Sequence, residues 1–153
     1  MSADLLEVAL SLAEAMPGSD EHASRSISTS YYAVFRHVCV KASSLLPGGE
    51  SGELVRAREH IERSIEHAVL LKRCKAIRKS DIGFPRAIID YASAISDLQE
   101  DRHLADYSRS HRFSREDALQ RYRRAREAIE GFDACDEKHQ RAFVVWANFE
   151  KRY

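Results

Sequence analysis

Residues 27–45, with the sequence ISTSYYAVFRHVCVKASSL, carry an apolar side chain at nearly every third or fourth position. An α-helix repeats about every 3.6 residues, so this spacing gathers the apolar side chains on one face over about five turns. Pro47-Gly48-Gly49 follows and predicts the end of that helix. The residues of the apolar face are Ile27, Tyr31, Val34, Val38, Ala42 and Leu45.

The same helical spacing recurs on both sides of this segment, and no stretch alternates with period two. Ser19 or Asp20 can cap the long helix, and Ser51 or Gly52 the next one. We therefore expect an all-α, up-and-down bundle of four to five main helices plus a short C-terminal helix. The other segments that carry the pattern are residues 5–16, 51–69, 88–107, 118–132 and 136–149.

Size and composition favour one compact domain. The chain has 153 residues, of which 44% are hydrophobic, and its 24 basic side chains balance 24 acidic ones. Because the charges balance, the net charge alone does not point to any class of binding partner. Three cysteines far apart in sequence argue against a disulfide framework and against a thiolate zinc site. The N-terminal residues lack the pattern of a signal peptide, and no apolar run reaches the length of a membrane span. We expect a cytoplasmic protein without metal or cofactor.

Two basic stretches stand out against this neutral background. Either could be an ordinary solvated helix face, or a surface that contacts RNA phosphates. The first stretch is followed by the loop-like Ser80-Asp81-Ile82-Gly83. The candidates for nucleic-acid contact are Lys72, Arg73, Lys75, Arg78, Lys79, Arg109 and Arg112.

Three motifs resemble the HEPN family of small helical domains. Ser30–Phe35 (SYYAVF) is similar to its Tyr-Tyr-Ala-x-Phe signature, and Arg102–Tyr107 (RHLADY) to its Arg-x-x-Ala-Asp-Tyr segment. Phe113–Ala118 (FSREDA) is similar to the turn and helix start that follow. The resemblance covers residues 1–132, which we take as the bundle. Residues 133–153 are then an extension that packs on the bundle or on a dimer partner.

The resemblance implies a homodimer with a cleft where the polar segment meets the double-tyrosine helix. Many family members are metal-independent ribonucleases, and many are toxins paired with a nucleotidyltransferase-type antitoxin. Others bind RNA or nucleotides without catalysis. The expected cleft residues are Tyr32, Arg36, Arg102, Asp106 and Tyr107.

The nuclease members carry an arginine and a histidine separated by four to six residues. An imidazole moves protons near neutral pH, and a guanidinium stabilises the negative charge that grows on the phosphate. The positions at this spacing from Arg102 hold Tyr107, Ser108 and Arg109, so the pair is missing. His103 and His111 are the nearest substitutes as catalytic residues.

These observations leave three hypotheses about function: a binding module, an enzyme and a structural domain. The first is a HEPN-like module that associates with RNA or a nucleotide, as toxin or accessory subunit of a two-component system with a nucleotidyltransferase. The second is a metal-independent ribonuclease that cleaves RNA by attack of the ribose 2′-hydroxyl. The third is a non-catalytic structural dimerisation domain. The missing histidine favours binding over catalysis.

Overall fold

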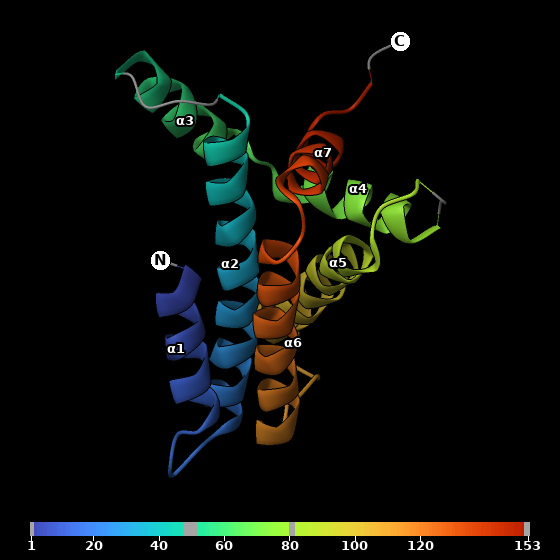
Figure 1. Ribbon diagram of the computed structural model, residues 1–153. Coiled ribbons are helices and arrows are strands. Elements are labelled where there is room, and N and C mark those ends of the chain that lie inside the picture. Colours follow the sequence, from blue (N-terminus) through green and yellow to red (C-terminus); the bar gives the residue numbers. More distant parts are fainter. Residues whose placement is uncertain (1, 48–51, 80–81, 152–153) are drawn as a thin grey trace.

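The protein folds into a bundle of α-helices (Figure 1). A computed structural model describes residues 2–47, 52–79 and 82–151, and these ranges contain seven helices and no strand. The all-α expectation is thereby confirmed. No helix in the described ranges has both the length and the apolar character needed to cross a membrane. The helices are α1 (Ser2–Ala13), α2 (Asp20–Leu45), α3 (Gly52–Ser64), α4 (His67–Lys79), α5 (Arg86–Tyr107), α6 (Arg115–Asp133) and α7 (Glu137–Asn148).

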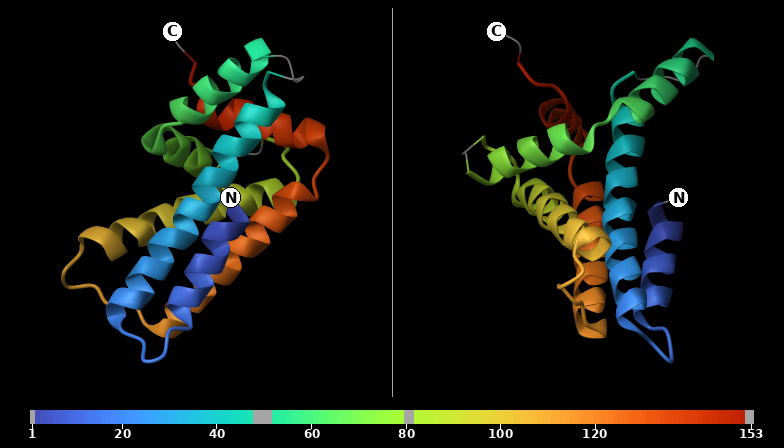
Figure 2. Two further views of the ribbon diagram at one scale, coloured as in Figure 1. Left: turned by 90° about the vertical axis from the view of Figure 1, so that its left-hand side faces the viewer. Right: turned by 180° about the vertical axis from the view of Figure 1, so that it is seen from behind.

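The long helix α2 is the axis of the bundle. It lies beside α1, α5 and α6 along much of its length, and α3 and α7 contact its C-terminal end (Figure 2). The side chain of Ser19 accepts a hydrogen bond from the backbone N–H of His22, as expected of the cap at the start of α2. Tyr31, Val34 and Val38 are at most 1% exposed. The apolar face predicted for this helix therefore forms the centre of the core.

The predicted third helix is interrupted. Residues 51–69 were expected to form one helix, but α3 ends at Ser64 and α4 begins at His67 with a new direction (Figure 1). The reason lies in packing: α3 has no buried residue and lies at the outer end of α2, whereas α4 turns Leu70 and Cys74 into the core. The basic stretch that begins at Leu71 thus belongs largely to α4. The predicted stop at Gly48-Gly49, the cap at Ser51 and the loop residues Ser80-Asp81 lie outside the described residues.

The C-terminal extension packs on the bundle of its own chain. Phe143 is fully buried, with its ring centroid 5.3 Å from that of Tyr91 on α5 and 5.6 Å from that of Phe132 on α6. Aromatic rings at such separations pack favourably edge to face. Helix α7 therefore completes the same hydrophobic core as the preceding helices.

Helix α5 is held in place by charged side chains from both of its neighbours. Asp97 accepts hydrogen bonds from Arg78 of α4 at 2.9 Å and from Arg124 of α6 at 2.6 Å. One turn further on, Arg121 donates to Asp101 at 2.9 Å. Guanidinium groups hold carboxylates in defined geometry, so these bonds fix the rotation of α5. That rotation decides which side chains α5 turns toward α2.

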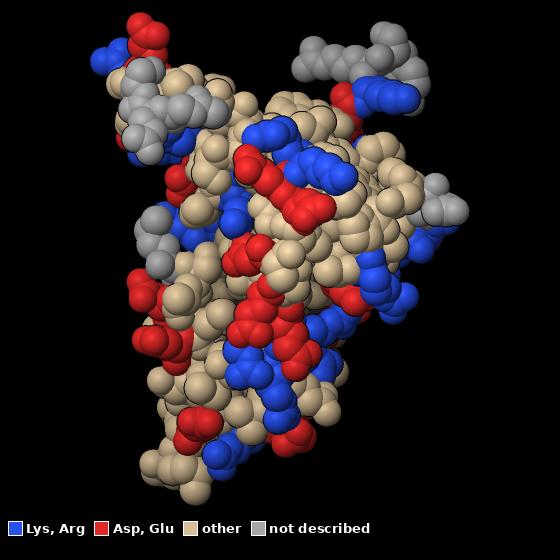
Figure 3. All heavy atoms as spheres, in the orientation of Figure 1, with Lys and Arg blue, Asp and Glu red and all other residues tan. Residues whose placement is uncertain are grey.

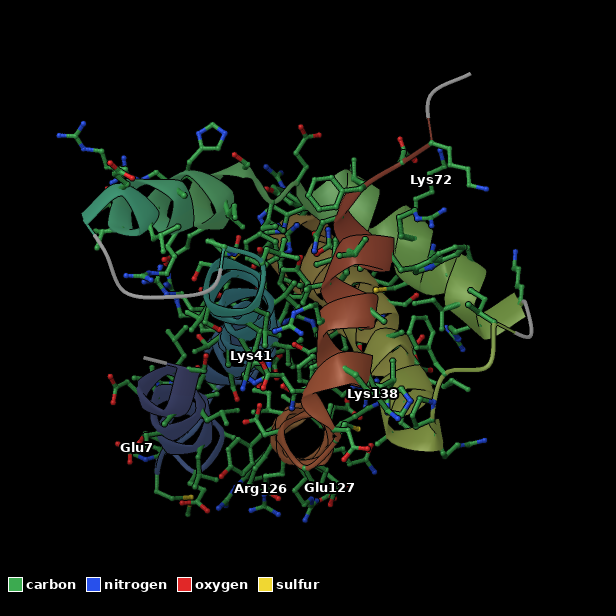
Figure 4. All side chains as sticks on the ribbon, turned by 45° about the horizontal axis from the view of Figure 1, so that its top comes forward. Glu7, Lys41, Lys72, Arg126, Glu127 and Lys138 are labelled. Carbon is green, nitrogen blue, oxygen red and sulfur yellow. The ribbon has the colours of Figure 1, made fainter. Side chains whose placement is uncertain are left out.

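A buried chain of hydrogen bonds ties α2, α5 and α6 together. Nδ1 of His37 lies 2.7 Å from the Tyr91 hydroxyl, and its Nε2 lies 2.8 Å from Oδ1 of Asp133. Burial lowers the pKa of His37, although the Asp133 carboxylate works in the opposite direction. A neutral imidazole between these groups donates from Nε2 to Asp133 and accepts from the phenol at Nδ1. Lys41, labelled in Figure 4, adds an ion pair to Asp133 at 3.1 Å.

Candidate functional site

Arg102 lies between helices, facing the double-tyrosine segment. Helix α5 places its guanidinium carbon 5.4 Å from the ring centroid of Tyr31 and 5.7 Å from that of Tyr32. Its side chain is only 12% exposed. Among the described residues, its Nε has no hydrogen-bond partner. A buried N–H without a partner is costly, so the Nε of Arg102 is an unsatisfied donor inside the bundle.

Asp106 connects Arg102 to α2. Its Oδ2 lies 3.6 Å from Nη1 of Arg102, and its Oδ1 accepts a hydrogen bond from the Ser28 hydroxyl on α2. The four-residue spacing on α5 thus serves an intrahelical ion pair and, through Ser28, a link between helices. The carboxylate neutralises Arg102 only loosely, because 3.6 Å is longer than a strong charge-assisted hydrogen bond.

His67 joins the same cluster, and the sequence did not reveal it. The residue begins α4, and its Nδ1 lies 2.5 Å from the Tyr31 hydroxyl. Its ring is stacked on that of Phe35, with centroids 3.8 Å apart and an interplanar angle of 16°. The side chains of α2, α4 and α5 therefore bring an imidazole, a phenol and a guanidinium together. We call Tyr31, Tyr32, His67, Arg102 and Asp106 the Arg102 cluster.

The protonation states of this cluster follow from burial and from the fixed positive charge. Burial lowers the pKa of His67, and the neighbouring Arg102 lowers it further. Burial raises the pKa of the Tyr31 hydroxyl well above its usual range, although Arg102 opposes this. A phenol that stays protonated donates to Nδ1 of a neutral imidazole, which leaves the imidazole proton on Nε2. At neutral pH the cluster therefore holds one cation and a neutral imidazole.

A groove of about 690 Å³ lies beside the cluster, between α1, α2 and the end of α5. Tyr32 and Asp106 belong to both the groove and the Arg102 cluster. Tyr107, the last residue of α5, is 67% exposed on the groove wall. The remaining lining residues are Leu12, Glu21, Ser24, Arg25, Ser28, Thr29 and Ala105.

The other candidates for catalysis and for the cleft lie elsewhere on the surface. His103 is exposed, with its ring centroid 5.0 Å from that of Tyr107. His111 is exposed beside Phe113, with the centroids 4.4 Å apart. Arg36 is directed to α3, where it pairs with Glu62 at 3.1 Å. His67 is thus the imidazole whose protonation Arg102 affects.

Most of the basic candidates for nucleic-acid contact have partners within the chain. Lys72, labelled in Figure 4, pairs with Glu150 at 2.7 Å, and the guanidinium carbon of Arg73 lies 3.8 Å from the Trp146 ring centroid. Basic and acidic side chains alternate over the face seen in Figure 3. Lys79 and Arg109 are exposed. The remaining pairs are Lys75 with Glu100, Arg78 with Asp97, and Arg112 with Asp20.

Within the described ranges, no group of three histidine, cysteine, aspartate or glutamate side chains is arranged to hold a metal ion. The Arg102 cluster brings together one guanidinium, one imidazole, two phenols and one carboxylate. Comparison of the chain with family models, with curated proteins and with solved structures found no match.

Proposed function

We propose that this chain is a HEPN-like module that binds RNA or a nucleotide through a phosphate at Arg102. In this proposal it acts as the toxin or accessory subunit of a two-component system with a nucleotidyltransferase-type protein. The observation that carries the phosphate site is the state of Arg102. The guanidinium is largely buried against two tyrosine rings, has an Nε without a partner among the described residues, and pairs with Asp106 only at 3.6 Å.

Physical chemistry favours an anion there. A guanidinium presents a planar fork that matches two phosphate oxygens, and a partly desolvated site strengthens their attraction. The neutral imidazole of His67 lies close to the same guanidinium, so Arg102 supplies the positive charge of the cluster. Because the Nε is buried, a phosphate oxygen would take the place of Asp106 at the Nη1 of Arg102, and Asp106 would keep its hydrogen bond from Ser28.

Direct titration tests this proposal. Labelled single-stranded RNA is titrated with wild-type protein in chelator and followed by fluorescence polarisation. The Arg102→Ala variant is expected to bind at least tenfold more weakly, as is usual when a bound phosphate loses a charge-assisted partner. Arg86→Ala is the matched control, because Arg86 is 85% exposed at the other end of α5. Equal affinity of wild type and Arg102→Ala would exclude the proposed phosphate site.

A ribonuclease is the second candidate, and the position of His67 favours it. The chain lacks the family spacing of arginine and histidine, but folding brings this imidazole to Arg102 from another helix. In such a reaction the ribose 2′-oxygen attacks the adjacent phosphorus as its proton leaves, and the 5′-oxygen departs with a proton. The products are a 2′,3′-cyclic phosphate and a 5′-hydroxyl, and an imidazole is suited to both proton transfers.

Cleavage and binding are separated by one further assay. RNA incubated with protein in chelator is analysed for cyclic phosphate ends. If the chain is a nuclease, His67→Gln abolishes cleavage while retaining binding, and His103→Gln and His111→Gln cleave as wild type does. Binding without cleavage in the wild type would leave only the binding module. Absence of both would leave the structural dimerisation domain.

A further inference from the structure

The groove beside the Arg102 cluster is lined by both aromatic and polar side chains. Two tyrosines with exposed faces belong to its wall: Tyr32 is 39% exposed and Tyr107 is 67% exposed. Its polar lining includes the carboxylates of Glu21 and Asp106, the guanidinium of Arg25, which pairs with Glu21 at 2.9 Å, and hydroxyls on α2. An exposed aromatic side chain in a concave, polar site is typical of positions where a planar ligand stacks.

We propose that this groove binds one unpaired nucleobase, stacked on Tyr32 or Tyr107, while the phosphate of the same nucleotide contacts Arg102. The proposal rests on the function proposed above and names its ligand more closely: single-stranded rather than duplex RNA. A base inside a duplex already stacks on its neighbours and has no free face for a tyrosine.

Two residues belong to both the groove and the Arg102 cluster, which supports the proposal that one ligand contacts both. Tyr32 contacts the Arg102 guanidinium with its ring and lines the groove, and Asp106 pairs with Arg102 and lines the groove. Arg102 and Asp106 are one helical turn apart, which is about 6 Å along α5. Arg102 itself does not line the groove, so a nucleotide with its phosphate at Arg102 reaches the groove past Tyr32 and Asp106.

The groove balances its charges within its own lining. Glu21 pairs with Arg25 at 2.9 Å, and Asp106 lies 3.6 Å from Arg102, so each carboxylate has a guanidinium beside it. The exposed rings of Tyr32 and Tyr107 therefore direct the base, rather than the phosphate, into the groove. Carboxylates accept hydrogen bonds from amino groups, such as N4 of cytosine. The Ser28 hydroxyl already donates to Asp106 and leaves further lone pairs on that carboxylate as acceptors. We therefore expect bases with an exocyclic amino group to bind better than uracil.

The test compares oligonucleotides of equal charge. Labelled single-stranded RNAs of the same length, one of cytidines, one of uridines and one abasic, are titrated with protein. Wild type is expected to bind the cytidine strand about tenfold more tightly than the abasic strand, in the range usual for stacking of one base. The uridine strand should lie between the two.

Substitutions of the groove tyrosines test whether the preference for cytidine over abasic RNA arises in the groove. Tyr32→Leu and Tyr107→Leu are expected to lower the preference for cytidine over abasic RNA, and the phenylalanine variants at both positions to retain it. Tyr122→Leu is the control, since that ring packs on Arg126 of α6 and lies outside the groove. Thermal melting of each variant verifies that it is folded.

The outcomes separate the groove from the phosphate site. If Arg102→Ala weakens binding of all strands equally while both leucine variants keep the cytidine preference, the groove proposal is wrong and the phosphate site stands. If the leucine variants lose the preference but Arg102→Ala changes nothing, the groove stands and the proposed function fails. Equal binding of cytidine and abasic RNA by wild type overturns the groove proposal outright.

Discussion

Replacing Tyr91 by phenylalanine removes one buried hydroxyl and leaves Nδ1 of His37 without its donor. The Tyr91 side chain is fully buried and the two atoms are 2.7 Å apart, so no water takes the place of the hydroxyl without a shift in packing. A buried acceptor that loses its partner costs about 1–3 kcal/mol. We expect Tyr91→Phe to lower the free energy of unfolding by about 2 kcal/mol at pH 7.5. For a chain of this length that corresponds to a fall in Tm of about 4–8 °C.

The loss should depend on pH in a defined direction. Burial lowers the pKa of His37 in the folded chain below its unfolded value of about 6.5. The unfolded chain then binds more protons than the folded one just below that value. The contribution of His37 to the free energy of unfolding of the wild type is therefore fully present above pH 6.5 and is lost as the pH falls toward the folded pKa. Without the phenol, the neutral imidazole loses a partner and the pKa of His37 rises, so the decline in the variant is shallower.

Urea unfolding of wild type and Tyr91→Phe at pH 7.5 and pH 5.5, followed by circular dichroism, measures both effects. The difference between the two proteins should be larger at pH 7.5. Tyr122→Phe makes the same chemical change on a half-buried side chain of α6 and should stay within about 0.5 kcal/mol of wild type. A constant difference at both pH values, or none, would refute the hydrogen-bond chain described for His37.

Three further perturbations test the core, a cap and the thiols. Phe143→Ala empties a fully buried site and should cost about 3–5 kcal/mol in urea unfolding; a loss below about 1 kcal/mol would show that α7 does not complete the core. Ser114→Ala removes the side-chain acceptor that begins α6 and should cost about 1 kcal/mol, measured in the same way, and an unchanged midpoint would contradict the capping box. Burial raises the pKa of all three thiols, but Cys39 and Cys74 are buried whereas Cys135 is partly exposed, so a maleimide at pH 7.5 should label Cys135 alone before unfolding. Intact mass spectrometry would reveal a second adduct if this is wrong.

The sequence predicted the helices wherever local signals agree with packing. The apolar spacing of α2 and the cap at Ser19 both act within a few residues, and the structure confirms them. Such local rules are independent of the rest of the chain. They sufficed for the class of fold and for most helix boundaries.

The break between α3 and α4 could not be predicted in this way. No glycine or proline stands at Ile65-Glu66, and the apolar spacing continues across it. The chain turns there because Leu70 and Ile77 reach the core only if α4 takes a new direction. This is a tertiary effect that outweighs local propensity.

The position of His67 depends on the same turn. On an unbroken helix this residue would share a face with His60, seven positions earlier, and nothing would direct it to Tyr31. Arg102 and Asp106 could be named beforehand because they lie in the segment that resembles the HEPN Arg-x-x-Ala-Asp-Tyr motif. The imidazole arrives from a separate helix, and its placement is a product of the whole fold.

The pairing of basic side chains along α4 and α5 has a consequence for how any polyanion is bound. A protein that neutralises many phosphates releases many condensed cations, and its affinity then falls steeply with added salt. Here Lys75 and Arg78 are already matched by Glu100 and Asp97, so they release few cations when RNA arrives. If binding is centred on Arg102, the logarithm of the affinity should fall with the logarithm of the salt concentration with a slope of about −0.7, the value for one phosphate of a single strand, whereas a broad basic surface gives a much steeper fall.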